Sequence, residues 1–277
     1  MSAIALPASL EIRSTADRAL RGAARFWLAV AVVGQWIFLY YIAMVYGGSS
    51  LTGNFAAWAK NTFLIKGYVA HDTAGNIAFA AHALLAGVTS FGGAVQLIPW
   101  IRQRAIAAHR WNGRLFLVTA IGVSVSGLYM VWMRGARLGA GPAIGITLNA
   151  VLIIVCSVMA WRTAVRREVA THRRWALASY LTANGQWFFR VGMFAWILVN
   201  RGPVGITKGM GGPFPLIWSF GCYLLPLGVL ALYLRASSAA PRARLAMAGG
   251  LFVLTVLMGI GIFGVTMVMW APVLRRL

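Results

Sequence analysis

Acidic residues are the scarcest feature of this 277-residue chain, which contains four of them against 25 basic residues. Charged residues of both signs amount to 10% of the sequence, whereas soluble domains usually carry about 25%. Hydrophobic residues make up 60%. This composition excludes an ordinary soluble globular protein and predicts an integral membrane protein. The four acids are Glu11, Asp17, Asp72 and Glu168.

Several classes of function lack the residues that they require. The last apolar run, 245–274, contains no lysine that could form a retinal Schiff base. No acid lies inside a predicted span, which argues against proton pumping through a carboxylate relay. The sequence has no HExxH, nucleotide-binding motif or Ser/His/Asp arrangement. The two cysteines, Cys156 and Cys222, lie in apolar runs and form no CxxC pair.

Long apolar runs define the fold class. A spanning helix needs about 20 mostly apolar residues, and backbone groups in lipid must be satisfied within the segment. The sequence therefore predicts an all-α, polytopic helix bundle over residues 26–277. The run with the weakest membrane signal is 115–133, which is short and rich in glycine and serine. The seven predicted spans are 26–46, 73–101, 115–133, 142–161, 175–200, 213–234 and 245–273.

The formal charge of +21 sets the topology rather than indicating nucleic-acid binding, because the basic residues lie in short loops and form no basic domain. With a cytoplasmic N-terminus, 16 Lys and Arg residues fall in cytoplasmic segments and 8 in outer segments. This bias predicts an N-in, C-out protein of the bacterial cytoplasmic (inner) membrane. Residues 1–25 are then a basic segment on the cytoplasmic surface, and aromatic residues such as Trp58 in the outer loop 47–72 anchor it at the interface or form an interfacial helix.

Arg190 is the only charged residue in the run 175–200. An arginine at mid-membrane costs about 2.5–3.5 kcal/mol and normally faces the bundle with a partner. The chain supplies no obvious carboxylate for it. Thr182 and Gln186 precede it by eight and four residues, which would place all three on one helix face. We expect either a hydrated pocket that binds a ligand through them, or an arginine satisfied by carbonyls and water.

His82 is the second intramembrane ionisable residue. It lies nine residues after Thr73, about 14 Å from the outer end of its helix, and Arg190 lies about 15 Å from Asn200 on the same side. The two side chains are therefore predicted to share a layer and to contribute to one ligand site. The alternative is a neutral histidine that hydrogen-bonds to a neighbouring helix.

His109 and His172 occur in a repeated pattern, A-x-H-R followed by Trp, at the cytoplasmic start of two spans. One hypothesis is a b-type haem whose iron is held by both imidazoles, with Arg110 and Arg173 binding its propionates. The other is that the pattern combines positive-inside charge with interfacial tryptophan. The motifs alone leave both open.

The segments "HALLAGVTSFGGAVQLIPWIRQRAIAAHRWNGRLF" and "RREVATHRRWALASYLTANGQWFFR" resemble a family of bacterial and fungal multispanning proteins, domain of unknown function 2306. That family has a His in one span, Q-x-x-P, HRW-x-GR, HRRW and an Arg in the next span. The resemblance covers about residues 70–200 and implies no particular activity. The matching residues are His82, Gln96 with Pro99, His109 to Arg114, His172 to Trp175, and Arg190.

A weaker similarity is to cytochrome b561-type bundles, in which helices 2 and 4 hold one haem and helices 3 and 5 another. His82, His109 and His172 match three of the four ligand positions. The fourth predicted span contains no histidine. The similarity therefore implies only the inner haem, between His109 and His172.

Three functions remain open at this point. The first is electron transfer through one haem, with a quinone-like molecule near His82 and Arg190. The second is haem-free binding or transport of a small anionic or lipid-like molecule by Arg190, Gln186 and His82. The third is an accessory or assembly subunit in which Arg190 meets an acidic group of a membrane partner. The small-residue motif GPAIG at 141–145 is suited to close helix packing, within the bundle or in a homo-oligomer.

Overall fold

The computed structural model describes residues 8–60 and 67–275, and in these ranges the protein is built from helices without a β-sheet. The prediction of an all-α, polytopic bundle is confirmed. Phe63, Leu64 and Lys66 of the outer loop lie outside the described residues, as do residues 1–7. The longer helices are α1 (Ala8–Ile42), α3 (Thr73–Leu97), α5 (Ile106–Trp132), α6 (Ala140–Val165), α7 (Val169–Ala183), α8 (Gly185–Val199), α9 (Pro213–Ala236) and α10 (Pro241–Val265).

Short elements complete the chain at both ends of the bundle. Two of them, η1 and η4, are π-helical turns that prolong α1 and α10. They pack near one another, since η4 contacts α1 and α11 contacts η1. The short elements are η1 (Ala43–Gly47), α2 (Gly48–Leu51), η2 (Phe55–Lys60), α4 (Pro99–Arg104), η3 (Lys208–Met210), η4 (Thr266–Trp270) and α11 (Ala271–Leu274).

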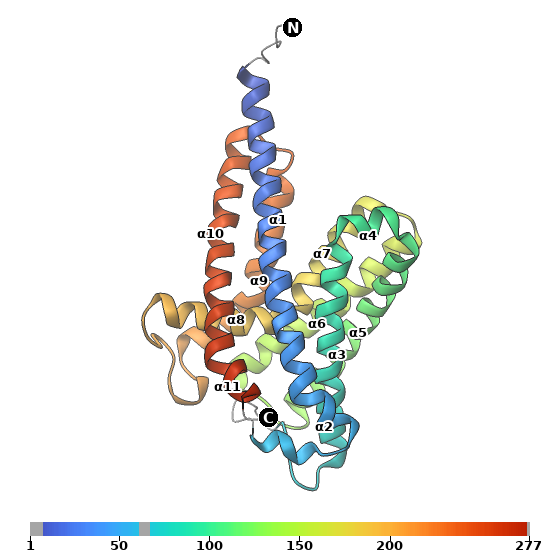
Figure 1. Ribbon diagram of the computed structural model, residues 1–277, viewed down its shortest axis with the longest axis vertical. Coiled ribbons are helices and arrows are strands. Elements are labelled where there is room, and N and C mark those ends of the chain that lie inside the picture. Colours follow the sequence, from blue (N-terminus) through green and yellow to red (C-terminus); the bar gives the residue numbers. More distant parts are fainter. Residues whose placement is uncertain (1–7, 61–66, 276–277) are drawn as a thin grey trace.

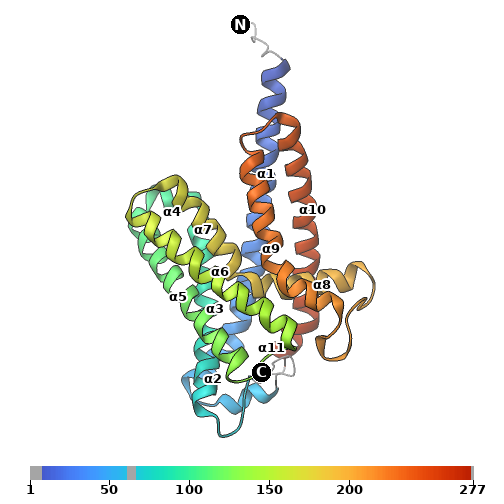
Figure 2. The same cartoon turned by 180° about the vertical axis from the view of Figure 1, so that it is seen from behind.

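Six described helices are long and apolar enough to cross a membrane, and they correspond to six of the seven predicted spans. The run 115–133, which has the weakest membrane signal in the sequence, is part of the 27-residue helix α5. Residues 8–25 are helical and continuous with the first span, and the start of α1 extends beyond α10 (Figure 1). The start of α1 and the end of α11 lie at opposite ends of the molecule (Figures 1 and 2).

The predicted continuous helix over 175–200 is wrong, because the chain breaks at Asn184 into α7 and α8. Asn184 has φ −89° and ψ 8°, outside helical geometry. Its side-chain amide donates to the carbonyl of Tyr180, so it competes with the backbone for the last acceptors of α7. The following Gly185 lies against the side chain of Asn149 from α6, and a Cβ there would collide with it. As a result α8 runs crosswise to α1 and α10 (Figures 1 and 2).

The helices form two groups that splay apart toward the end where α1 begins (Figures 1 and 2). In one group α3 packs on α5, α5 on α6 and α6 on α7. In the other, α10 packs on both α1 and α8, and α8 packs on α9. Contacts of α1 with α3, and of α9 with α6 and α7, join the groups. Gly145 of the GPAIG motif lies against Ser219 of α9, so this motif serves packing inside the chain.

Polar side chains tie the helices at two places along α1. Near the middle, the buried Gln35 donates from Nε2 to the hydroxyl of Tyr180 in α7, at 2.8 Å. At the splayed end, Asp17 and Arg244 form an ion pair between α1 and α10. The Gln35–Tyr180 contact joins the two groups of helices, whereas the Asp17–Arg244 pair lies within the group that contains α1 and α10.

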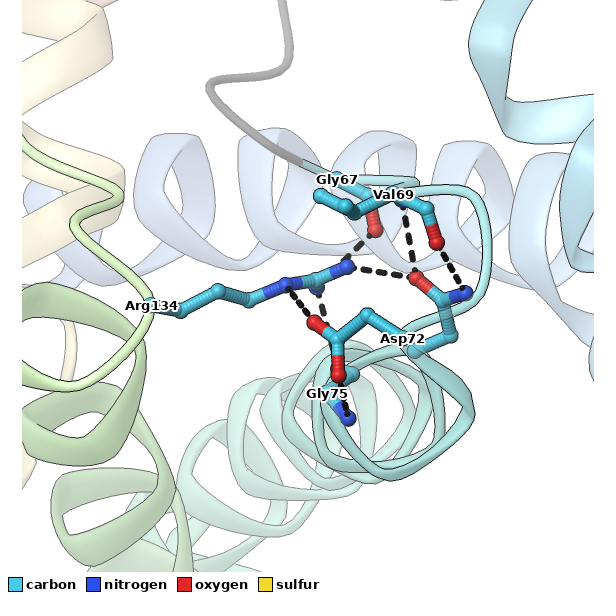
Figure 3. Close-up of polar contacts among 6 residues, drawn as sticks. Gly67, Val69, Asp72, Gly75 and Arg134 are labelled. Atoms are coloured by element: carbon cyan, nitrogen blue, oxygen red, sulfur yellow. Dashed lines mark hydrogen bonds and ion pairs between the residues drawn. The ribbon is translucent and has the colours of Figure 1, made fainter.

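The end of the bundle opposite the start of α1, the predicted outer end, is held by a cluster around Arg134 (Figure 3). Its Nε lies 3.0 Å from Oδ2 of Asp72, and Nη1 donates to the carbonyls of Gly67 and Gly75. Nη2 donates to Oδ1 of Asn76. Asp72 also caps α3 by accepting from the backbone N–H of Gly75, at 2.9 Å. Arg134, 8% exposed, thus joins the α5–α6 connection to the loop that precedes α3.

The described aromatic residues of the loop 47–72 are also part of the packed interior. Trp58 is 2% exposed and donates from Nε1 to the hydroxyl of Ser49. Its ring packs against Phe55, Tyr46 and Phe79. The expectation that Trp58 anchors the loop at the membrane interface is therefore wrong.

Candidate functional site

A large cleft opens between the two groups of helices, on the side where they splay apart. It has a volume of about 1580 Å³ and is lined by residues of α1 and of α3 to α10. Gly93 of α3, Phe116 of α5 and Tyr180 of α7 meet at its inner end, where a Cβ on Gly93 would lie 2.9 Å from both rings. We call these three residues the floor of the cleft. Phe116 lies about 10 Å further along α5 than His109.

The mouth of the cleft is strongly basic. Seven arginines line it, and no acid occurs among the described residues of its wall. They come from α1, α4, α5, α7 and the α6–α7 connection, so the charge converges from both groups of helices. The arginines are exposed, and the two histidines beside them, His109 and His172, are partly buried. The arginines are Arg21, Arg25, Arg102, Arg110, Arg114, Arg167 and Arg173.

His109 and His172 lie in the same cleft, from the first turns of α5 and α7, and interact electrostatically with each other. Nδ1 of His172 lies 2.9 Å from the carbonyl oxygen of Ala160. Because a carbonyl only accepts, Nδ1 carries the proton and Nε2 is left as a base or ligand. Nδ1 of His109 is buried and has no hydrogen-bond partner among the described residues. Gln96 holds the backbone here by donating to the carbonyl of His109, at 2.8 Å.

Beyond the mouth the cleft wall is apolar. It is formed by α8, α9 and α10 on one side and by the floor on the other. Pro226 lies inside α9 at this wall. The arrangement combines a cationic entrance with a hydrocarbon-like interior, so it suits a molecule that has one anionic and one apolar end. The apolar wall includes Phe188, Val191, Pro226, Leu254, Leu257 and Met258.

Arg190 and His82 lie outside the cleft, and they interact electrostatically with each other. Nη1 of Arg190 donates to the carbonyl of Gln186 at 2.7 Å, and the guanidinium lies over the ring of Phe38, 5.8 Å from its centroid. Nδ1 of His82 lies 3.0 Å from the hydroxyl of Ser126. The structure thus brings the two sequence-predicted residues into one layer, separate from the histidines of the mouth.

Thr182 does not join this layer. The break at Asn184 puts it on α7 whereas Gln186 and Arg190 are on α8, so the three residues do not share one helix face. Thr182 is fully buried, and its hydroxyl donates to the carbonyl of Ala178 in its own helix. Gln186 contacts Arg190 through its backbone carbonyl. The predicted polar stripe is therefore wrong for Thr182.

Residues 79–208 match the profile of the family described as Predicted membrane protein (DUF2306). These residues are similar to that family, over a little less than half of the chain. The resemblance inferred from the sequence is confirmed over these residues. No curated protein and no solved structure matches the chain. The family description supports a membrane protein, and the six long apolar helices among the described residues make it multi-pass.

Most of the DUF2306-like motif residues converge on the mouth of the cleft. Gln96 with Pro99, His109, Arg110, Gly113, Arg114, His172 and Arg173 all line it. They come from four helices and three motifs, and the HRW-x-GR and HRRW motifs are more than 50 residues apart in the sequence. Trp111 is 70% exposed and lies under the guanidinium of Arg114, 5.0 Å from its ring centroid. The DUF2306-like motifs therefore build one surface rather than two unrelated helix ends.

Sequence reasoning missed three parts of this arrangement. The predicted surface segment 1–25 includes Arg21 and Arg25, but these residues line the cleft. The contact of Gln35 with Tyr180 had no sequence signal, because both residues look like isolated polar groups in apolar helices. The pairing of Arg134 with Asp72 did have a sequence signal, because Asp72 is the only acid in the predicted outer segments.

Proposed function

We propose that the protein binds an anionic amphiphile in the cleft, with the head group at the basic mouth and the apolar chain along α8 to α10. The observation that carries this proposal is the convergence of seven arginines and no acid at the entrance of an apolar cleft. Guanidinium groups bind phosphate and carboxylate groups through charge-assisted, often bidentate hydrogen bonds. Several of them around one site favour a head group with two or more negative charges.

The head group sets the selectivity in this proposal. An apolar chain that moves from the bilayer into an apolar cleft exchanges one hydrocarbon environment for another and gains little free energy. Hydrogen bonds to charged groups contribute about 1.5–3 kcal/mol each. Two lost arginine contacts therefore weaken binding by at least about a hundredfold, at 1.4 kcal/mol for each factor of ten. If the mouth faces the cytoplasm, as the charge bias predicts, the ligand enters from the inner leaflet of the bacterial membrane.

Purified full-length protein in nanodiscs provides the test. Brominated phosphatidic acid that enters the cleft quenches the fluorescence of Trp27 and Trp218, which line it. Both brominated phosphatidic acid and brominated phosphatidylcholine quench exposed tryptophans such as Trp36 and Trp100, so we expect an additional, saturable quenching by phosphatidic acid alone. The double variant Arg110→Gln/Arg173→Gln should weaken it by about a hundredfold. Arg242→Gln is the matched control, since it removes one exposed charge at the same end without touching the cleft.

Equal quenching by the two lipids would overturn the proposal, because it would mean that the apolar wall alone recruits lipid. Equal losses in the cleft variant and in the Arg242 control would also contradict it. That result would assign the effect to the general positive potential of this membrane face.

A second candidate is binding of a b-type haem between His109 and His172. Two features support it: both imidazoles belong to one cleft, and the Nδ1–H of His172 is held by a carbonyl, the usual arrangement for a metal-binding histidine. Arg110 and Arg173 would hold the propionates. The chemistry that haem supplies is one-electron transfer.

A reduced-minus-oxidised absorbance spectrum of the protein expressed with haem supplementation separates the candidates. A sharp visible band that is lost in His109→Ala and in His172→Ala supports haem. His71→Asn is the control, because His71 lies far from the mouth and asparagine tolerates its positive φ of 64°. Absence of the band in the wild-type protein would exclude this candidate and leave the lipid test unaffected.

A further inference from the structure

The layer that contains Arg190 lies on the far side of the cleft floor. Along α1, Gln35 bonds to Tyr180 of the floor, and Phe38 and Tyr41 follow at about 5 and 9 Å. Along α3, His82 lies 11 residues before Gly93, about 16 Å further from the mouth. Gln35 and Tyr180 are 0% and 2% exposed. The guanidinium is therefore separated from the basic cleft by packed side chains.

No carboxylate in the described part of the chain compensates the charge of Arg190. Asp72 pairs with Arg134, Asp17 with Arg244, and Glu168 lies 4.0 Å from Arg166. Glu11 lies 27 residues before Phe38 on α1, about 40 Å away along the helix. Arg190 is partly buried, and a charge held largely away from water without a counter-charge destabilises the fold.

The groups around Arg190 are mainly neutral. It interacts electrostatically with Tyr41, Tyr46 and Cys222, and its guanidinium lies over Phe38. The carbonyl of Gln186 accepts one of its five N–H donors. These contacts stabilise a cation through aromatic faces and dipoles, but they leave a full positive charge inside the bundle.

Further donors without acceptors in the described ranges lie on the helices that contribute to this layer. Trp270 packs against Phe38, with ring centroids 5.3 Å apart, and is fully buried. Tyr223 adjoins Cys222, and Trp187 precedes Arg190 by one helical turn. The indole Nε1 atoms of Trp270 and Trp187 and the hydroxyl of Tyr223 have no hydrogen-bond partner among the described residues. Native proteins rarely bury several donors without acceptors, so such a group calls for an explanation.

We propose that Arg190 binds a small monovalent anion of the halide class in this layer, with His82, Trp270 and Tyr223 around it. One monovalent anion neutralises one guanidinium, whereas a divalent anion would leave a buried charge of the opposite sign. A halide ion can also accept several hydrogen bonds, which suits the surplus of N–H and O–H donors. The enclosure by Phe38 and Trp270 favours a compact ion over the amphiphile of the cleft.

Thermal unfolding of the purified full-length protein in chloride and in gluconate, at equal ionic strength, tests this assignment. An anion that binds the folded state alone raises its stability by mass action. We expect an apparent Tm about 5 °C higher in saturating chloride. The shift should vanish in Arg190→Gln and persist in Arg114→Gln, which changes the cleft only.

Arg190→Lys keeps the charge and covers the case in which Arg190→Gln does not fold. Because lysine lacks the planar fork, this variant should bind chloride more weakly, by about tenfold or more. The assignment is overturned by equal Tm values of the wild-type protein in the two anions, by an unchanged chloride affinity in the lysine variant, or by loss of the shift in Arg114→Gln. The quenching assay with phosphatidic acid is independent, so failure of one site leaves the other testable.

Discussion

Replacing Arg134 by methionine removes the charge at the centre of the outer cluster while it keeps most of the side-chain volume. The variant leaves Asp72 without its ion-pair partner and the carbonyls of Gly67 and Gly75 without a side-chain donor. Asn76 retains its contacts with the backbone of Val69, so α3 should still begin at the same residue. The loop before α3 then loses its attachment to the α5–α6 connection.

The cost follows from the burial of the two partners. Removing one member of a fully buried ion pair destabilises a protein by about 3–5 kcal/mol. The side chain of Arg134 is 4% exposed, but that of Asp72 is 33% exposed, so water relieves part of the loss. We therefore expect a decrease in the free energy of unfolding of about 2–3 kcal/mol. This corresponds to a fall in apparent Tm of about 3–6 °C for a chain of this size.

Thermal unfolding in detergent measures this fall, with Arg137→Met as the control. Arg137 lies in the same connection and is exposed over the ring of Trp132, so its replacement should change Tm little. A double-mutant cycle with Asp72→Asn then isolates the pair. A coupling free energy below about 0.5 kcal/mol would refute the assignment of Arg134 and Asp72 as the bond that holds the outer end.

Three further outcomes are expected. Tyr180→Phe leaves the amide of the buried Gln35 without its acceptor. The free energy of unfolding should therefore fall by about 1–3 kcal/mol in a denaturation assay. An unchanged value would contradict the role of this hydrogen bond in closing the floor of the cleft. Gly261→Ala places a Cβ against the backbone carbonyl of Val191, and forced separation of α8 from α10 should cost about 1–3 kcal/mol, measured as a loss of Tm. A cysteine introduced at Ser238, in the exposed α9–α10 turn, should react with an impermeant maleimide only in inside-out vesicles; reaction in intact cells would reverse the predicted orientation.

The sequence was sufficient for the spans because hydrophobicity over about 20 residues is a long-range signal that tolerates local irregularity. The predicted spans 115–133 and 142–161 fall, to within a residue, inside the bounds of α5 and α6, which begin earlier in the sequence than predicted. The sequence also predicted that no acid inside a span accompanies Arg190, and in the described residues Asp72 and Asp17 pair with other arginines. The orientation of the bundle stays a prediction.

Local backbone chemistry explains where the sequence-based interpretation was wrong. The dipeptide Asn184-Gly185 is a turn signal, but an apolar run on both sides concealed it. A single break there turns the second half of the run away and separates Thr182 from Arg190. The interior position of Trp58 could not be predicted either, because tryptophan near a membrane end is equally suited to the interface and to a packed core.

The cleft is a property of tertiary structure that no single motif contains. Each HR-W motif alone is what positive-inside charge and interfacial tryptophan would produce. Only the packing of α5 beside α6, and of α6 beside α7, brings His109 and His172 to one surface. Arg21 and Arg25 of α1, a helix of the other group, line the same cleft.

Because the two groups of helices splay apart, a small rotation of α1 about its contact with α7 would cause a larger displacement at the mouth of the cleft. The contact of α1 with α7 at Gln35 lies near the narrow end, and Arg21 lies 14 residues further, about 21 Å toward the mouth. A rotation of about 10° about the contact would move Arg21 by about 4 Å, enough to make or break a hydrogen bond across the entrance. An anion that bridges arginines of both groups would therefore draw the mouth together, and a pair of spin labels on α1 and α5 would record the closure as a shorter distance.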